Sequence, residues 1–429
     1  MNLSIVCIGT RGDIQPYIAL AIGLNEVGHH TTLVAPLDHE SLIKTFNLPY
    51  APIHINISAF LESEKWQQAL SSNSKTIKEL SSFFNKNRAI IQDDIYNSTL
   101  KSDAIITTEL ARAYSICISE SRNVPCIVAL TYPSGPPSGY FSNIFYFPKS
   151  FKWKWLNKTS HQLFEYLSWS SSKAKYQEIR KKLGLGSTNE SVFKYLRRKK
   201  IEKLHLYSDV LFNRPLDWPS ENTLTGFLTL PKKDRSKLKF EEPSQQLMTF
   251  LNNGPAPVFI GFGSMPVFDS DTLLKAILDA THEAGVRAII SGSWKNLNTS
   301  ELSPNVCFVK SIDHDFLFQK CAIICHHGGA GTTAAALLAG KPSIICSFFG
   351  DQPFWGERLK ALGVGTYFPF RKFSKSLFLS ALKYGQKKDV IQRAEEIGIR
   401  MRKEPGLTNA VNRIQTSLRA QSLHNNKSQ

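Results

Sequence analysis

The residues best suited to chemistry lie at positions 325–356, where a glycine-rich loop is followed by an acidic one. Glycines at 328, 329 and 331 separate an apolar segment, Ala322 to Cys325, from a helix-like segment, Thr332 to Ala339. This order predicts a buried strand, a tight turn and a helix N-terminus. Free N–H groups and the positive end of the helix dipole at such a terminus can bind a diphosphate.

A second group of polar side chains follows one strand later. The helix is expected to stop at Gly340, a buried strand from Ser343 to Cys346 follows, and the next loop carries Asp351 and Gln352. Carboxylate and amide oxygens can accept hydrogen bonds from sugar hydroxyls. Because parallel strands present their following loops at the same edge of a sheet, the two loops are predicted to bind two parts of one ligand.

The N-terminus repeats the order of strand, glycine turn and helix. Leu3 to Ile8 is predicted to be a strand, and Pro16 is predicted to open a helix that ends at Gly28. The turn has Gly-x-x-Gly spacing and no acidic residue ends the next strand, Thr31 to Ala35, so a nicotinamide enzyme is not indicated. From spacing alone, Asp13 is either a general base or a cap of the helix near Pro16.

Strands and helices alternate through both halves of the chain. Further strands are predicted at 103–107, 125–130 and 258–262, and helices at 110–122, 272–283 and 388–420, the last broken at Pro405. The run Arg214 to Pro219 interrupts the pattern. We therefore expect an α/β protein with domains at 1–218 and 219–400 and a C-terminal segment, 401–429, made of a helix and a disordered tail after Gln421.

Composition limits the classes of partner. The 429 residues suffice for two domains of ordinary size, and 52 Lys+Arg against 35 Asp+Glu give a formal net charge of +17. This charge favours nucleotides, nucleic acid or an anionic membrane, although a solvated basic surface would explain it equally well. Because no zinc-ribbon spacing, RNA-binding aromatic motif or dense arginine stripe is present, we expect no nucleic-acid partner.

The sequence also bears on compartment and metal. The apolar run at Met1 to Ile8 is too short for a signal peptide, and no run reaches the ~20 apolar residues of a membrane-spanning helix. The seven cysteines lie mostly in apolar segments, which is typical of reduced thiols in a cytoplasmic protein. Cys325, His326 and His327 are consecutive in a predicted strand and alternate between its faces, so a zinc site is not predicted.

Residues 131–214 are unusually aromatic and basic. A helix here would place one apolar face beside lysines, formed by Trp153, Leu156, Leu163, Phe164 and Leu167. Such a face suits peripheral contact with an anionic membrane, for example the inner membrane face, or a pocket for a lipophilic acceptor. The alternative is that it packs into the core, as amphipathic helices usually do.

The two loops together support a family resemblance. His-Gly-Gly-Ala-Gly-Thr-Thr at 327–333, followed by Gly-Asp-Gln-Pro-Phe-Trp-Gly at 350–356, resembles the donor-site signature of UDP-dependent glycosyltransferases with a GT-B fold. The likeness is greatest to their sterol 3-beta-glucosyltransferase branch and to bacterial natural-product relatives. It implies two Rossmann-like domains facing across a cleft, with a C-terminal helix that crosses back to the first domain.

The resemblance also implies roles for particular residues. It assigns the nucleoside to Trp294 and Ile312, the sugar to Asp351 and Gln352, and the diphosphate to Ser264, His327, Gly329, Gly331, Thr332 and Thr333. In the N-terminal half, it implies that Asp13 is the catalytic base, at the position where many plant members carry histidine. The same half contributes a loop lining the cleft, formed by Gly9, Thr10, Arg11 and Gly12.

Two departures from the family pattern and one metal-like motif refine these expectations. Ala335 stands where plant members carry a ribose-binding glutamate, so TDP is a rival to UDP. Thr131 to Gly135 replaces a Trp-Thr-Arg-like segment of the sterol branch, so the acceptor is not specified as a sterol. Asp313-His314-Asp315 has the Asp-x-Asp form of a metal motif, but Asp313 precedes a helix and is more simply its N-cap, so we expect no metal or other cofactor.

The resulting hypothesis is a metal-independent, inverting hexosyltransferase that moves a hexose, with glucose preferred, from a UDP-sugar to a hydroxyl of a lipophilic small molecule such as a sterol, lipid or polyketide. The alternatives are a TDP-sugar-dependent natural-product glycosyltransferase and a UDP-sugar 2-epimerase. The non-enzyme alternative is a catalytically silent module that binds a sugar nucleotide.

Overall fold

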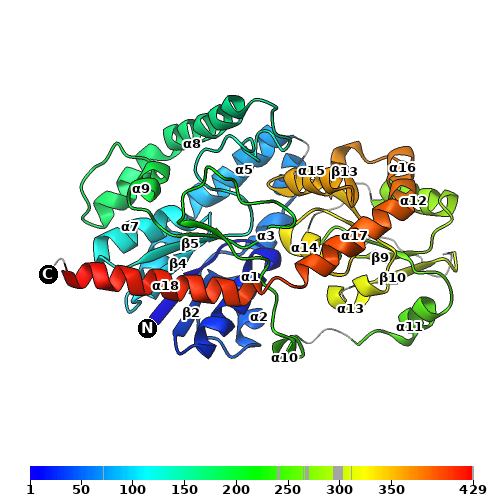
Figure 1. Ribbon diagram of the computed structural model, residues 1–429, viewed down its shortest axis with the longest axis horizontal. Coiled ribbons are helices and arrows are strands. Elements are labelled where there is room, and N and C mark those ends of the chain that lie inside the picture. The colour runs from blue at the N-terminus through cyan, green and yellow to red at the C-terminus, as the bar shows by residue number, and fades with distance from the viewer. Residues whose placement is uncertain are drawn as a thin grey trace. The chain divides into compact units, whose positions relative to one another are not determined.

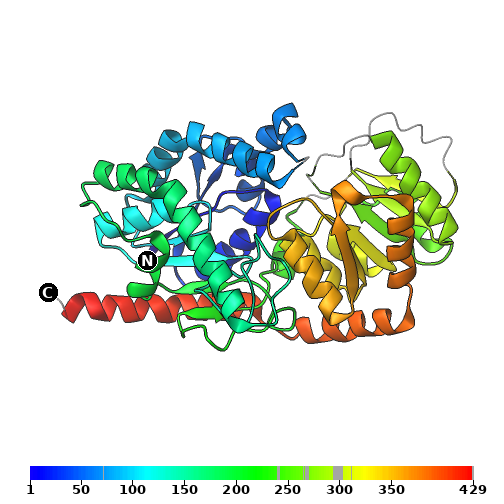
Figure 2. The same ribbon diagram turned by 90° about the horizontal axis from the view of Figure 1, so that it is seen from above.

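The computed structural model describes residues 1–70, 72–238, 242–263, 265, 270–292, 303–310 and 312–427. The chain divides into two compact units (Figures 1 and 2). The first comprises residues 1–58, 81–238 and 404–429, and the second comprises residues 59–80 and 239–403. Residues 219–238 therefore pack with the first unit, although the break at 214–219 in the sequence pattern precedes them.

The first unit contains a seven-stranded sheet in the order β3-β2-β1-β4-β5-β6-β7, and every neighbouring pair is parallel. The predicted strands of this half are confirmed, with boundaries shifted by one or two residues. The strands are β1 (Asn2–Val6), β2 (His30–Pro36), β3 (Tyr50–Ile53), β4 (Ala104–Thr107), β5 (Cys126–Leu130), β6 (Lys203–His205) and β7 (Asn222–Leu224).

Helices connect these strands. Those wholly within the first unit are η1 (Leu37–His39), α1 (Arg11–Glu26), α2 (Glu40–Lys44), α6 (Arg88–Thr99), α7 (Arg112–Arg122), α8 (Lys154–Lys182), α9 (Val192–Arg198), α10 (Lys232–Arg235) and α18 (Gly406–Lys427). The segment around residues 59–80 carries α3 (Ile57–Glu62), α4 (Glu64–Ala69) and α5 (Asn73–Lys86). It groups with the second unit, where the Trp66 ring meets Phe349 edge-on at 5.3 Å between centroids.

The second unit contains a six-stranded parallel sheet in the order β10-β9-β8-β11-β12-β13. Its strands are β8 (Val258–Gly261), β9 (Ala288–Ser291), β10 (Val306–Val309), β11 (Ile323–His326), β12 (Ser343–Ser347) and β13 (Gly365–Pro369). Its helices are α11 (Gln245–Asn252), α12 (Ser270–Glu283), α13 (His314–Gln319), α14 (Ala330–Leu338), α15 (Gln352–Leu362), η3 (Phe370–Lys372), α16 (Lys375–Gly385) and α17 (Lys388–Met401).

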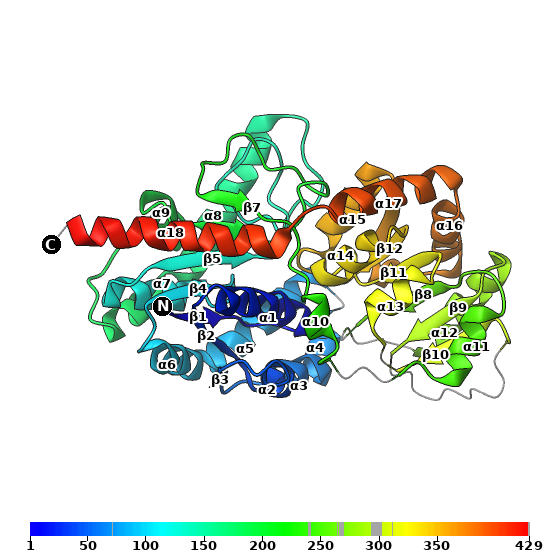
Figure 3. The ribbon, with the colours of Figure 1, turned by 60° about the horizontal axis from the view of Figure 1, so that its bottom comes forward.

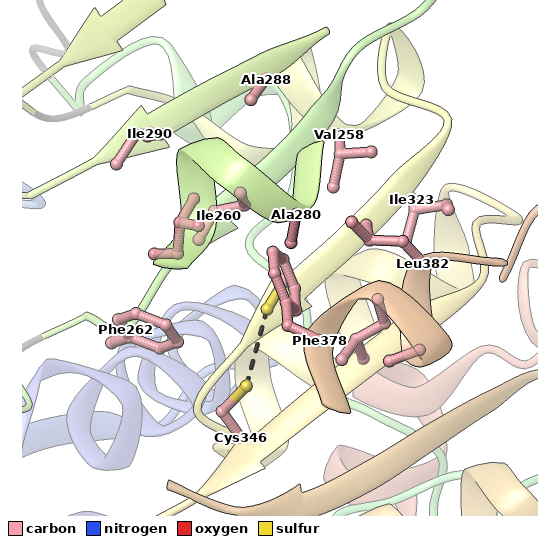
Figure 4. Packing of buried hydrophobic residues seen from close by; sticks show 14 of the residues in the cluster. Val258, Ile260, Phe262, Ala280, Ala288, Ile290, Ile323, Cys346, Phe378 and Leu382 are labelled. Carbon is pink, nitrogen blue, oxygen red and sulfur yellow. Dashed lines mark hydrogen bonds between the residues drawn. The ribbon is translucent and has the colours of Figure 1, made fainter. Parts of the chain in front are cut away.

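Both faces of the second sheet are buried. One face packs against α12 and α16 through a cluster that includes Ile260, Ile323 and Phe378 (Figure 4). The other packs against α11, α13 and α14 through Phe259, Ile324 and other residues. Burial on both faces explains why these strands are short, continuous apolar runs, which the sequence pattern detects.

The last helix, α18, packs on the first unit, as the expected fold requires. It lies beside α1 (Figure 3), and a Cβ added to Gly23 would be 3.0 Å from side-chain atoms of both Leu407 and Val411. The backbone of α18 extends to Lys427, past Gln421, after which the sequence analysis expects a disordered tail.

All seven cysteines are buried and form no disulfide. The sulfur atoms of Cys325 and Cys346 lie 3.7 Å apart in the core of the second unit (Figure 4). Among the residues that the structure describes, no helix is both long enough and apolar enough to cross a membrane.

Candidate functional site

The glycine loop joins β11 to α14. Strand β11 ends at His326, and Gly329 is the N-cap of α14. Gly328 has φ +95°, and a Cβ there would lie 2.6 Å from Ile345 Cγ2, so only glycine fits the turn. The predicted strand, tight turn and helix start are confirmed.

The amide groups that an anion can reach belong to the first three residues of α14, which are Ala330, Gly331 and Thr332, because a helix leaves its first N–H groups without intrahelical partners. Gly331 is exposed, and a Cβ added to it would meet no atom within 4 Å. Thr333 is different, because its N–H and its Oγ1 both donate to Gly329 O, each at 2.9 Å. The buried Thr333 side chain therefore holds the helix start together and does not face solvent.

His327 packs against two glycine turns. A Cβ on Gly329 would lie 2.6 Å from its Nε2, and a Cβ on Gly263, in the loop after β8, would lie 3.1 Å from its Cε1. The buried Nδ1 of His327 has no hydrogen-bond partner in the described part of the chain. Burial, with the nearby His314, lowers the pKa of His327 to about 4. The ring is therefore neutral at pH 7 and can donate one hydrogen bond to a phosphate without carrying a charge.

His326 supports the same turn from inside the core. Its Nδ1 accepts a hydrogen bond from Gly328 N at 3.0 Å, and its side chain is fully buried. Burial, together with the neighbouring His327, lowers the pKa of His326 well below its usual value. A neutral His326 is thus a structural part of the loop, not a ligand-binding group.

The acidic loop touches the glycine loop directly. A Cβ on Gly328 would lie 3.1 Å from Gln352 Cβ, so the two loops meet after the neighbouring strands β11 and β12. Gln352 is buried, and its Oε1 accepts hydrogen bonds from Phe348 N at 2.7 Å and Phe349 N at 3.3 Å. This side-chain oxygen therefore shapes the loop, which leaves Nε2 as the atom of Gln352 available to a ligand.

Asp351 is the N-cap residue of α15. Its Oδ2 accepts a hydrogen bond from the indole Nε1 of Trp355 at 2.7 Å, one helical turn later. Trp355 is fully buried, and this bond satisfies its indole N–H in the core. Asp351 therefore has a structural role at the start of α15.

Asp13 lies in the first turn of α1. The helix begins at Arg11, earlier than predicted, and Pro16 lies inside it. The cause is local, because Asp13 Oδ2 accepts hydrogen bonds from both Thr10 N at 2.8 Å and Thr10 Oγ1 at 2.9 Å, which stabilises the helix N-terminus. Asp13 thus caps a helix that starts at Arg11, not one that starts near Pro16.

The same geometry suits a proton acceptor. Asp13 Oδ1 makes no hydrogen bond to any described residue, whereas Oδ2 is held in place. Burial raises the pKa of Asp13, and the two bonds from Thr10 and the charge of His39 oppose that rise. Gly9 is needed beside it, because a Cβ at Gly9 would lie 2.5 Å from the Asp13 side chain.

Two supporting residues escaped the sequence analysis. His39 Nε2 lies 2.8 Å from Gly9 O and fixes the turn that carries Asp13, but its long sequence separation gives no local signal. Trp355 supports Asp351, and here a signal existed, since side chains at i and i+4 on a helix are neighbours.

The structure places the remaining predicted residues in different surroundings. Ser264 and Trp294 lie outside the described residues. Ile312 is 8% exposed, and its side chain belongs to the core cluster on one face of the second sheet. Arg11 and Gly12 are exposed at the start of α1. Asp313 accepts a hydrogen bond from Asp315 N at 3.0 Å as the N-cap of α13, so its predicted capping role is confirmed.

The two parallel sheets, together with the glycine loop that leads into α14 in the second unit, define the class as α/β proteins of the GT-B glycosyltransferase fold. Residues 3–134 match the glycosyltransferase family 28 N-terminal domain, and residues 275–414 match the erythromycin biosynthesis protein CIII-like C-terminal domain. The first half of the chain thus carries a glycosyltransferase family domain, and the resemblance seen in the two loops is confirmed.

Individual proteins agree with this assignment. A sterol 3-beta-glucosyltransferase of Cryptococcus neoformans is 30% identical over 97% of this chain, although the chain spans only 27% of that protein. The glycosyltransferase of kitacinnamycin has a TM-score of 0.72 at 13% identity, covering 97% of this chain and 99% of its own. Glycosyltransferase VinC, solved in complex with dTDP, has a TM-score of 0.67 at 16% identity, covering 98% and 100%.

Proposed function

We propose that the chain transfers a hexose, with inversion, from a UDP-sugar to a hydroxyl of a lipophilic small molecule. The observation that carries this proposal is the contact between two loops of the second unit, the glycine loop at the start of α14 and the loop of Asp351 and Gln352. The first offers unpaired amides to a diphosphate, and the second offers polar side chains beside it. A nucleoside diphosphate linked to a sugar has this order of groups.

The second unit has the task of stabilising the leaving group. Negative charge develops on the diphosphate as the bond to the anomeric carbon breaks, and preorganised donors aimed at such charge are commonly the largest catalytic contribution. The amides of Ala330, Gly331 and Thr332, with the neutral His327 ring, are suitable donors. Since these groups can replace a divalent cation, we propose that no metal is needed.

The first unit has the task of activating the acceptor. The acceptor hydroxyl oxygen attacks the anomeric carbon from the face opposite the diphosphate and loses its proton to Asp13 Oδ1. One carbon–oxygen bond forms as another breaks, which inverts the configuration and releases the nucleoside diphosphate. The fixed Oδ2 and the unbonded Oδ1 of Asp13 support this role.

The donor nucleotide has a specific rival. The VinC structure contains dTDP, and Ala335 leaves the ribose without the expected glutamate, so a TDP-sugar is the second candidate donor. For the acceptor, the sterol named for the Cryptococcus relative supports a lipophilic alcohol. The unpaired cysteines support a cytoplasmic enzyme, and peripheral contact with a membrane would bring it to such an acceptor.

The test is incubation of the purified chain with UDP-glucose or TDP-glucose and a panel of lipophilic alcohols. UDP release and a product heavier than the acceptor by one hexosyl group are expected, with no loss of rate in a chelator. Isomerised sugar nucleotide without acceptor would identify an epimerase, and binding without turnover would identify a silent module. A strict metal requirement would contradict the assignment of charge stabilisation to α14 and His327.

A further inference from the structure

The N-terminal half of α8 presents large apolar side chains to solvent. Trp153 is 63% exposed, Trp155 is 64% exposed and Tyr166 is 67% exposed. Leu163, Leu167 and, in the preceding loop, Tyr140 are also exposed. The core alternative considered from the sequence is therefore wrong for Trp153, Leu163 and Leu167, whereas Leu156 and Phe164 are half-buried.

The inner side of this helix segment carries buried polar residues next to the half-buried Phe164, whose ring stacks on that of Phe145. Asn157 Nδ2 donates to Gly139 O at 2.9 Å, Ser160 Oγ accepts from Asn143 N at 2.8 Å, and His161 Nε2 lies 2.9 Å from Phe141 O. Asn157, Ser160 and His161 are all buried. The helix thus holds the loop at 139–151 by these hydrogen bonds and by the Phe164 contact, while Trp155, Leu163, Tyr166 and Leu167 stay exposed.

The charge around this face is mainly positive. Lys149, Lys152, Lys154 and Lys158 are exposed, and no acidic residue occurs between Tyr140 and Phe164. The Lys154 ammonium lies over the Tyr140 ring at 4.6 Å. The next acidic residue, Glu165, is bound by Arg197, with Nη2 donating to Oε2 at 2.9 Å. From another part of the chain, the exposed Asp217 accepts a hydrogen bond from Gly139 N at 2.7 Å, so the four lysines exceed the acidic groups but do not stand alone.

We propose that this surface, the α8 patch of Tyr140, Trp153, Trp155, Leu163, Tyr166 and Leu167 with its four lysines, binds the surface of an anionic lipid bilayer. Aromatic and leucine side chains with neighbouring lysines are suited to the boundary between headgroups and acyl chains, where the rings enter and the ammonium groups meet lipid phosphates. A protein partner would instead have to cover four lysines with acidic groups. The α8 helix belongs wholly to the first unit (Figures 1 and 2).

This inference deepens the proposed function and rests on it for its purpose, because a lipophilic acceptor partitions into bilayers. Binding to a bilayer would raise the local concentration of acceptor beside the first unit, which carries Asp13. The binding itself does not depend on catalysis. It can therefore be measured without donor or acceptor.

The experiment is flotation of the full chain with phosphatidylcholine vesicles that contain about one third phosphatidylglycerol, compared with pure phosphatidylcholine. We expect the wild-type chain to float with the anionic vesicles. The triple variant Trp153→Ser, Trp155→Ser, Tyr166→Ser should bind at least tenfold more weakly. Neutralising Lys152, Lys154 and Lys158 as glutamines should weaken binding by roughly fivefold per lysine, and added salt should do the same.

The matched control is Leu100→Ser, which removes a 48% exposed leucine at the C-terminal end of α6 in the first unit and should bind like the wild type. UDP affinity, measured by calorimetry in solution, should be the same in the wild type and the three variants. This measurement checks the fold and the donor site independently of vesicle binding. Equal vesicle binding by wild type and the aromatic variant would overturn the inference. So would self-association that the aromatic variant abolishes, because the patch would then be an interface between copies.

Discussion

Asp13 holds two roles through its two oxygens. Oδ2 accepts both Thr10 hydrogen bonds and starts α1, while Oδ1 is unbonded among the described residues. A capping role and a catalytic role are usually treated as alternatives for one residue. Here they are compatible, because capping fixes the orientation of the carboxyl group that the base requires.

Replacing Asp13 by Asn tests the catalytic role while preserving the cap. The amide oxygen can still accept from Thr10, so thermal stability should change little. Transfer should fall by roughly a hundredfold to ten-thousandfold, since the amide cannot take a proton. UDP affinity, measured by calorimetry, should stay within a few-fold. Transfer at a rate near that of the wild type would show that Asp13 only caps the helix.

Thr10 should control the pH dependence of the reaction. Its hydroxyl donates to Asp13 and so lowers a pKa that burial raises. In Thr10→Val that pKa should rise further. Because the base must be ionised, the rate falls as pH drops through this pKa, and the acid limb of kcat/KM should move to higher pH. Thr10→Ser keeps the hydroxyl and should not shift the limb; identical profiles for Val and wild type would refute the coupling.

Two substitutions of Asp351 are needed to separate its structural role from sugar binding, because its carboxylate accepts a hydrogen bond from the buried Trp355. Asp351→Ala leaves the indole N–H unpaired and should cost about 1–3 kcal/mol of stability. Asp351→Asn keeps an acceptor for the indole but removes the charge. We expect Asn to retain wild-type thermal stability and UDP affinity but to bind UDP-glucose roughly tenfold more weakly. Calorimetry with both ligands decides, and equal weakening of UDP and UDP-glucose would exclude a sugar contact.

At the scale of elements, the start of α14 combines a tight glycine turn with an open helix end. Gly328 satisfies the turn at φ +95°, Gly329 makes room for the His327 ring, and Gly331 lies in open space. The three glycines therefore serve different purposes. Only the last is free of steric demands from the protein itself, so its absence of a side chain matters chiefly to a ligand.

Gly331→Ala should separate fold from ligand binding. Alanine is a better helix former than glycine, so stability should be unchanged or higher by up to about 1 kcal/mol. The added methyl stands where a phosphate would approach, and UDP affinity should fall roughly tenfold, the equivalent of losing one hydrogen bond to a charged group. Gly329→Ala is the contrasting variant, because its Cβ would lie 2.6 Å from His327 Nε2 and both stability and binding should drop. If UDP affinity is unchanged in Gly331→Ala, the diphosphate does not bind at this helix end.

At the scale of the whole molecule, α18 returns the end of the chain to the first unit. Arg413 in α18 bonds both oxygens of Glu202, with Nε to Oε1 at 2.7 Å and Nη2 to Oε2 at 2.8 Å. The Glu202 side chain is only 6% exposed, whereas that of Arg413 is 34% exposed. This ion pair joins residues far apart in sequence and makes the stability of the first unit depend on its last helix.

Arg413→Leu should destabilise the first unit by about 3 kcal/mol, less than for a fully buried pair because Arg413 is partly exposed. Burial already raises the pKa of Glu202, and removing Arg413 should raise it further. The loss of stability should therefore shrink as pH falls through that pKa and the carboxyl group gains a proton. The double variant Glu202→Gln, Arg413→Leu should recover most of the loss in calorimetry at neutral pH. A double variant as unstable as the single one would show that packing, not the charge, causes the effect.

The sequence by itself determined the strands, the glycine turns and the pairing of the two loops of the second unit. Those features are local: buried parallel strands are continuous apolar runs, and a turn such as Gly328 accepts no other residue. The early start of α1 was missed for a local reason as well. Proline is typical of a first helical turn, so Pro16 outweighed the weaker signal of Thr10 and Asp13, whose hydrogen bonds start the helix at Arg11.

Only the tertiary structure decided which face of a helix packs against the protein and which faces solvent. Helical periodicity shows that Trp153 and Leu163 share a face with Leu167, but the direction of that face depends on what the opposite side binds. Asn157, Ser160 and His161 hold the 139–151 loop, so the aromatic side faces solvent. Likewise, His39 reaches Gly9, and Arg413 reaches Glu202, across separations that no local pattern records. Hydrogen bonds between distant segments arise from packing, and packing is a property of the folded chain.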